Sequence, residues 1–283
     1  MILSPFTPIF FQPRKGHNGA PSRYIQTWAP TDQIMLQFIG VTGETPPLTI
    51  VHSACDDAAV HTVEYSTWQM NTDDVLYFAT IQGLSYGCYY IHIDGLGDSE
   101  LFKVTDNERE LAQTTLIQYA MRDNRQRDDA VFLIDSMPTF FDFRVPGGFK
   151  DGGWQFGVEN EQFVTDSADI IELYGMDSVS KSFTMGEGDG VPIWFGELMN
   201  RLLTCTYVYF DGVRYARKES NVPEVTQLDD LLNSFVITQM VQKVTHLNPV
   251  IENANHVALR RIDSTYYRRS DIDSETDINR LTT

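Results

Sequence analysis

Short apolar segments recur through the first third of the chain. Between residues 34 and 104 they return about every twelve to fifteen residues, with turn-forming residues between them. Such spacing of short strand-like segments favours a β-sandwich or barrel. We therefore predict an immunoglobulin-like sandwich over residues 32–105. Its expected strands are 34–41, 48–53, 60–70, 75–81, 88–94 and 100–104.

A second strand series follows a polar break at 105–111, which is either a helical turn capped by Thr105 or a linker. Glycine pairs at 147–148 and 152–153 predict sharp turns or bulges, and Asp211-Gly212 predicts a type I′ hairpin between 206–210 and 213–218. The second domain is expected to span 112–248, so the predicted fold class is mainly β, with two antiparallel domains. Its other expected strands are 114–122, 130–135, 139–145, 168–176, 179–185 and 235–244.

The two ends of the chain differ from this pattern. Residues 1–31 contain five prolines among several aromatic residues. Proline cannot donate a ladder hydrogen bond, whereas aromatic side chains favour burial, so we predict an extended arm that lies on this chain or on a neighbouring one. Residues 249–283 lack apolar periodicity, and we predict a polar C-terminal tail.

The stretch "TMGEGDGVPIWFGELMNRLLTC", residues 184–205, could be a phosphate-binding loop or a structural connector. A P-loop needs Lys followed by Ser or Thr after its last glycine, but Val191 and Pro192 follow Gly190. Glu187 and Asp189 would also repel an anion. We therefore predict no nucleotide site here.

The same stretch fits a short amphipathic helix over residues 191–203. Pro192 suits the first helical turn, and the apolar residues that follow keep the helical i, i+3, i+4, i+7 spacing. We expect this apolar stripe to fill the core of the second domain. Its residues are Trp194, Phe195, Leu198, Met199, Leu202 and Leu203.

The net charge of the chain limits the classes of molecule that it can bind. The chain has 39 acidic and 21 basic residues, a formal net charge of −18 and a pI near 4.6. Such a field repels phosphate backbones and anionic membranes, so we expect no direct nucleic-acid or membrane binding. The sequence has no run of about 18 apolar residues and no basic segment typical of an export signal. Cys55, Cys88 and Cys205 are widely spaced, and we predict that each is a buried free thiol in a reducing cytoplasm.

No residue pattern indicates catalysis or metal binding. The six histidines form no ligand motif, and we expect hydrogen-bonded structural roles for His52 and His92 in strands. The acidic run 271–277 has Thr276 where a calcium loop needs glycine, and no G-x-S-x-G elbow occurs. We predict no catalytic, cofactor-binding or metal-binding residues and no cofactor. The acidic pairs, expected to be solvated, are Asp56-Asp57, Asp73-Asp74, Asp128-Asp129 and Asp229-Asp230.

Aromatic residues leave one binding alternative open. Trp28, Trp68 and Trp154 could stack on sugars, as in carbohydrate-binding modules, but they fall in different segments. Aromatic residues in strands usually lie in the core, and we expect that here.

Residues 143–225 resemble virion structural proteins of tailed phages and prophages of Bacteroides-type bacteria, including crAss-like ones. The likeness lies in the "GGF" turn, "ELYGM", the stretch "GDGVPIWFGELMNRLL" and the hairpin "DGVRY". Weaker likeness continues upstream through "TTLIQYAMRDN" into the predicted sandwich. The resemblance implies a β-rich subunit of a tail, a baseplate or a ring near the portal, without catalytic residues.

We therefore expect a non-enzymatic virion protein that is assembled in the host cytoplasm. Its expected partners are further copies in a cyclic homo-oligomer and other tail, neck or portal proteins. The arm and the polar tail suit a ring subunit, because such extensions lie on neighbouring copies. A glycan-binding module is the first alternative, and a glycan hydrolase with unidentified carboxylates is the second.

Overall fold

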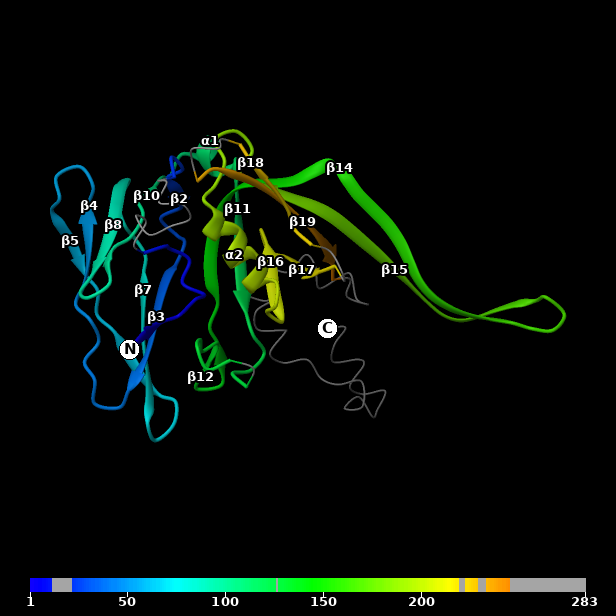
Figure 1. Cartoon of the computed structure of the whole chain (residues 1–283), viewed down its shortest axis with the longest axis horizontal. Helices are drawn as coiled ribbons and strands as arrows, with labels where there is room; N and C mark the ends of the chain where they lie inside the picture. The colour runs from blue at the N-terminus through cyan, green and yellow to red at the C-terminus, as the bar shows by residue number, and fades with distance from the viewer. Residues whose placement is uncertain (12–21, 126, 219–221, 229–232, 245–283) are drawn as a thin grey trace, which may run out of the picture. The chain divides into compact units, whose positions relative to one another are not determined.

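The computed structural model describes residues 1–11, 22–125, 127–218, 222–228 and 233–244. Over these ranges the chain is mainly β, which confirms the predicted fold class (Figure 1). Residues 1–244 cluster as one compact unit that contains two hydrophobic cores. The predicted tail, 249–283, lies outside the described residues, as do residues 12–21 of the predicted arm and the acidic pair at 229–230.

The first core lies between two sheets, as expected for a sandwich. One sheet has the order β1 (Ile2–Leu3), β3 (Ile34–Val41), β7 (Asp74–Ile81), β6 (Ser66–Gln69). The other has the order β2 (Gln26–Trp28), β10 (Phe102–Val104), β8 (Gly87–Ile93), β4 (Thr49–Ser53), β5 (Ala59–Thr62), with β9 (Gly97–Asp98) beside β8. All pairs are antiparallel except β2 with β10.

Two features of this sandwich differ from the sequence prediction. The expected strand 60–70 is divided into β5 and β6, because the chain crosses from one sheet to the other between them. At this crossing Val63 is buried, and the Tyr65 hydroxyl bonds to Thr49 Oγ1 at 2.8 Å. Strand pairing also begins before residue 32, since β1 and β2 form sheet edges. Both features depend on pairing between distant segments.

The second core is enclosed by a seven-stranded antiparallel sheet. Its order is β15 (Ile170–Met185), β14 (Phe141–Val164), β11 (Thr114–Ala120), β16 (Tyr207–Phe210), β17 (Val213–Arg217), β19 (Phe235–Lys243), β18 (Glu224–Gln227). An additional pairing of β15 with β19 closes six of these strands into a barrel. The connection between the two cores contains α1 (Glu108–Leu111), which is capped by Asn107 rather than by Thr105.

Three expected strands of this region have other bounds in the structure. The strands predicted at 168–176 and 179–185 are one strand, β15, and the strand predicted at 139–145 is the beginning of β14. In the segment predicted as strand 130–135, only β12 (Leu133–Ile134) is a strand, and it pairs with β13 (Met137–Pro138). Before β12, a side chain provides the backbone hydrogen bonds that a neighbouring strand would otherwise make. The Gln37 amide donates to the Val131 carbonyl and accepts from the Val131 N–H.

Two local predictions are confirmed. Asp211 and Gly212 both have positive φ, 44° and 79°, as a type I′ turn between β16 and β17 requires. The register of β14 against β15 shifts between Phe149 and Trp154, at the second glycine pair.

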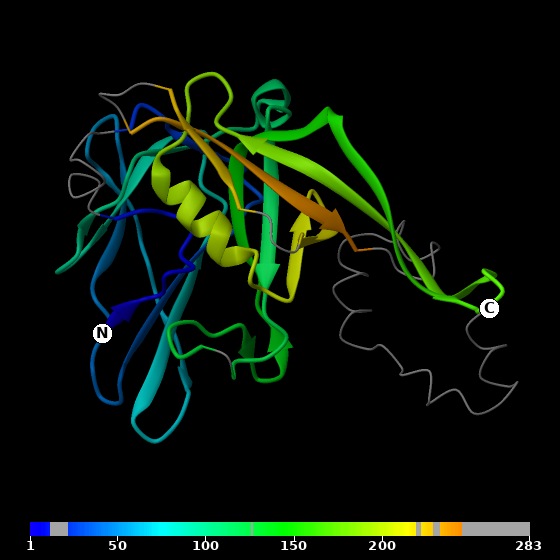
Figure 2. The ribbon, with the colours of Figure 1, turned by 45° about the vertical axis from the view of Figure 1, so that its right-hand side comes forward.

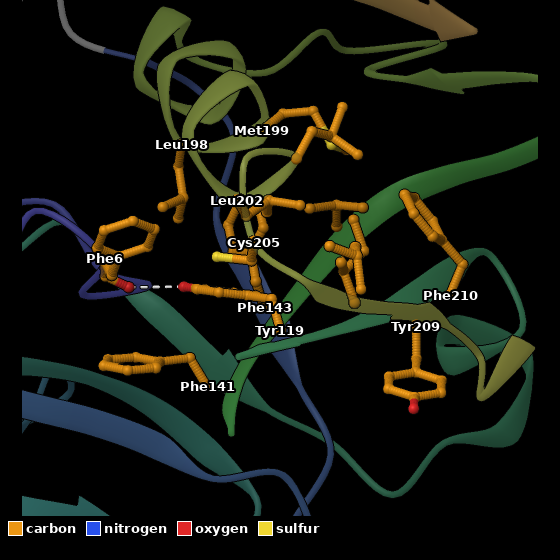
Figure 3. Close-up of a cluster of buried hydrophobic side chains, with 14 of the residues drawn as sticks. Phe6, Tyr119, Phe141, Phe143, Leu198, Met199, Leu202, Cys205, Tyr209 and Phe210 are labelled. Atoms are coloured by element: carbon orange, nitrogen blue, oxygen red, sulfur yellow. Dashed lines mark hydrogen bonds between the residues drawn. The ribbon is translucent and has the colours of Figure 1, made fainter. Parts of the chain in front are cut away.

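Helix α2 (Ile193–Leu202) fills the second core as predicted (Figures 2 and 3). Pro192 precedes the helix in an extended conformation and provides no side-chain cap. The amide side chain of Asn233 does so instead, because its Oδ1 accepts the Ile193 N–H at 3.0 Å. The buried residues of the stripe, each at most 7% exposed, are Trp194, Phe195, Leu198, Met199, Leu202 and Leu203.

The N-terminal segment lies on this chain and joins the two cores. β1 pairs with β3 in the sandwich, whereas Phe6 is fully buried in the second core beside Phe132 and Phe141. The Tyr119 hydroxyl donates to the Phe6 carbonyl at 2.6 Å (Figure 3). Phe11 then returns to the sandwich through a bridge to Ser99.

A buried ion pair joins the same two regions. The Arg144 guanidinium, on β14, donates from Nε and Nη2 to the two carboxylate oxygens of Asp32, at 2.6 and 2.9 Å. The two side chains are 12% and 2% exposed. Asp142, two residues earlier on β14, accepts from the Gln33 backbone N–H at 3.0 Å and from Gln118 at 2.7 Å. The buried carboxylates of Asp32 and Asp142 therefore both accept hydrogen bonds, which a charged group needs when it is removed from water.

Leu198→Ala should destabilise the protein by about 2–5 kcal/mol, because it removes a fully buried side chain and leaves a cavity between α2 and the barrel. Leu48→Ala, which makes the same change at a side chain that is 51% exposed, is the control and should cost less than about 1 kcal/mol. Urea unfolding followed by circular dichroism measures both. Equal losses for the two variants would contradict the position of α2.

Glu100 provides a pH prediction. Burial raises the pKa of its carboxyl above the ordinary value, and the indole N–H of Trp194, which donates to it at 2.8 Å, opposes the rise. The folded chain therefore binds more protons than the unfolded chain between the ordinary and the raised pKa. The free energy of unfolding falls as pH rises through that window.

Glu100→Gln keeps an acceptor for Trp194 and removes the buried charge. We expect this variant to be more stable than the wild type above that window, and to lose the advantage below the ordinary glutamate pKa of about 4.3. Urea titrations on both sides of the window measure the difference, with the exposed Glu108→Gln as control. An advantage that did not change with pH would refute the assignment.

Candidate functional site

Strands β14 and β15 continue beyond the barrel as a two-stranded ribbon (Figures 1 and 2). β14 pairs with β11 only up to Pro146, and β15 pairs with β19 only from Val179 onward. Among the described residues, 157–164 and 170–178 pair only with each other. We call the segment from Trp154 to Val179 the ribbon.

One face of the ribbon is apolar and exposed. Trp154, Phe156 and Val158 occupy alternate positions of β14, so they share a face, and they are 46%, 78% and 66% exposed. The rings of Trp154 and Phe156 stack with centroids 6.0 Å apart. Nearer the tip, Val164 lies opposite Ile170, and both are exposed. Large apolar side chains are thus gathered on a face that is largely exposed in the described chain.

This face continues the inner face of the barrel. Phe149 on β14 lies opposite Phe183 on β15, and the two rings are part of the second core or packed against it. Lys181 marks the change from core to ribbon, because its ammonium lies 3.6 Å from the Trp154 ring centroid and 5.3 Å from that of Phe149. Partial burial lowers the pKa of Lys181, and the nearby Lys243 adds to this effect.

The ribbon is also strongly acidic. Residues 154–179 contain no lysine, arginine or histidine, whereas they contain six carboxylates. The acidic residues are Glu159, Glu161, Asp166, Asp169, Glu172 and Asp177.

These properties are those of an interaction surface. A two-stranded ribbon alone is only marginally stable in water, and its two open edges are able to pair with another chain. A contiguous exposed apolar patch in a soluble protein commonly marks a contact with another molecule. The ribbon has both features.

The expectation that strand aromatics lie in the core is therefore wrong for Trp154, although it holds for Trp28, which is 1% exposed. Alternating apolar residues look the same in a strand that faces a core and in one that faces a partner. The sequence signal that could have indicated an exposed strand is its composition, because glycines and acidic residues surround these aromatic residues. Trp68 has a third environment, since its indole N–H donates to Asp135 at 2.9 Å on the surface.

The glycine loop is a structural connector. Gly186, Gly188 and Gly190 have φ of 86°, 99° and 74°, and a Cβ on Gly190 would lie 2.0 Å from Ser234 Oγ. The backbone of Val191 pairs with Phe235, and the Ser234 hydroxyl donates to the Asp189 carbonyl. The loop thus packs against the start of β19.

The other residues considered in the sequence lie apart from the ribbon. His52 and His92 occupy neighbouring strands as expected, and His92 bonds to Asp98 at 2.6 Å, which raises its pKa. Cys205 is buried as predicted, but Cys88 is only half-buried and Cys55 lies in an exposed turn, so the burial predicted for every cysteine is wrong for these two. Within the part of the chain that the structure describes, we find no cluster of metal-binding side chains, and no helix is long and apolar enough to cross a membrane.

Comparison with known proteins adds little. No protein-family model matches the chain, and no curated protein matches it. Among solved structures, one match is a complex described as Dpr2 Ig1-Ig2 with DIP-Theta Ig1-Ig3. It has 8% sequence identity and a TM-score of 0.17, and covers 78% of this chain and 88% of the other. A match with so low a TM-score gives no information about the function of this chain.

Hydrogen exchange should separate the two parts of β14. Amides of residues 141–146 pair with β11 inside the barrel and should exchange slowly, whereas those of 157–164 should exchange within seconds to minutes in the unassembled protein. Mass spectrometry of peptides from the two halves measures this difference. Equal protection would mean that the isolated chain already covers its ribbon.

Proposed function

We propose that this chain is a non-enzymatic structural subunit of a tailed-phage virion, in the tail, the baseplate or a ring near the portal. The observation that carries the proposal is the exposed apolar ribbon, which is held on a well-packed base and is suited to contact another subunit. The sequence resemblance of residues 143–225 to virion proteins supports the same role.

The ribbon also favours a cyclic assembly. It lies at one side of the barrel and differs from the rest of the surface, so a copy that binds it through another surface forms a head-to-tail contact. Repetition of such a contact closes a ring when the rotation between copies allows it. The assembled particle, formed in the host cytoplasm, is the proposed location.

Glycan binding is the second candidate, and one observation favours it. Trp154 and Phe156 present two stacked, exposed rings, which is an arrangement that sugars can stack on. A glycan array would decide this point, because the candidate requires hits that disappear in Trp154→Ala.

The double variant Trp154→Ala/Phe156→Ala tests the assembly role. We expect self-association to weaken by at least about thirtyfold, since aromatic side chains at the centre of an interface commonly contribute 2 kcal/mol or more. Sedimentation velocity over a concentration series measures the change. Tyr86→Ala, which removes an aromatic side chain that is 76% exposed outside the ribbon, should leave association unchanged.

Two results would oppose the proposal. Wild-type association that survives the double substitution would remove the ribbon from the assembly. Absence of the protein from purified particles, measured by mass spectrometry, would remove the virion role.

A further inference from the structure

We propose that the acidic ribbon of one copy binds a basic surface at the barrel mouth of a second copy. This basic mouth consists of Lys181, Arg217, Lys218 and Lys243. The inference rests on the proposed self-assembly and names the two surfaces that meet.

Strand pairing brings the basic mouth together. Val241 of β19 lies between Lys181 of β15 and Arg217 of β17, and Lys243 follows two residues later on the same face of β19. Lys218 follows Arg217, and its ammonium bonds to Gln155 at the start of the ribbon, at 3.1 Å. Three of the chain's 21 basic residues thus lie on three adjacent strands where the ribbon leaves the barrel, and Lys218 follows the end of β17.

The ribbon's own acids near its tip lie far from this surface. Asp166 and Asp169 lie at the turn between Val164 and Ile170, about eight residues along the strand from Phe156, which is opposite Val179. At 3.3 Å per residue this is roughly 25 Å from the barrel. Pairing with β15 reaches the tip, with one register shift between Glu161 and Gln162, and keeps the ribbon extended, so the acids at the tip can meet a basic mouth only on another molecule.

The charges also select the kind of contact between copies. Two ribbons packed against each other would bring together two acidic segments, each with six carboxylates and no basic residue, which is unfavourable. A ribbon placed on the basic mouth brings opposite charges together, and it covers the apolar face beside Trp154. The contact joins two different surfaces and is therefore head-to-tail.

Charge reversal with rescue tests this contact. Arg217→Glu/Lys218→Glu should weaken association of the full chain by about tenfold or more, and Asp166→Lys/Asp169→Lys should do the same. A protein that carries all four substitutions should return to within about threefold of the wild type. Arg109→Glu/Arg125→Glu makes the same charge change at exposed positions elsewhere and should have no such effect.

Cross-linking provides a measurement that does not depend on charge. In a Cys55→Ser background, one variant with Asp166→Cys and another with Lys218→Cys are mixed and oxidised. A disulfide-linked dimer of the two variants is expected, and it should not form when Asp166→Cys is mixed with Arg109→Cys.

The results separate this inference from the proposed function. Failure of rescue together with absence of the cross-link would overturn the contact. If association still depended on Trp154 and Phe156, the proposed assembly role would stand and the ribbon would bind another surface. A wild-type chain that stays monomeric but occurs in particles would also overturn the contact, while it would leave the virion role intact.

Discussion

The bidentate ion pair between Arg144 and Asp32 fixes the strand on which the rest of the structure depends. Strand β14 carries Arg144, contributes Phe141 and Phe143 to the second core, and continues as one half of the ribbon. Both charged groups are almost fully removed from water, so removal of one partner would leave the other uncompensated, a loss of about 3–5 kcal/mol. The pair thus attaches the first part of β14, from which the ribbon continues, to the sandwich.

The N-terminal segment joins the same two regions by burial. Phe6 occupies the second core, while β1 before it and Phe11 after it pair with the sandwich, and Arg201 of α2 donates to the Pro5 carbonyl at 2.7 Å. A ribbon that is only marginally stable alone needs such a base, because its contacts with a partner are productive only when its direction is fixed. Two cores that are held together therefore serve the assembly role that we propose.

Much of the local structure was predictable from the sequence. Short apolar segments between turn residues predicted β3 and β8, helical spacing predicted α2, and Asp211-Gly212 predicted its hairpin, since each depends on neighbours along the chain. Features that depend on contacts with a distant part of the chain were not predictable. They are the division of β5 from β6, the continuity of β15 and the capping of α2 by Asn233. No site residues were predicted, because the alternation around Trp154 is the same whether a core or a partner covers it.

The central claim is that the sandwich and the barrel act as one rigid base for the ribbon. Differential scanning calorimetry of the full-length protein tests it directly. The account predicts one cooperative transition, in which the calorimetric and van't Hoff enthalpies agree, because the ion pair and Phe6 couple the two cores. Two resolved transitions, one for each core, would contradict it.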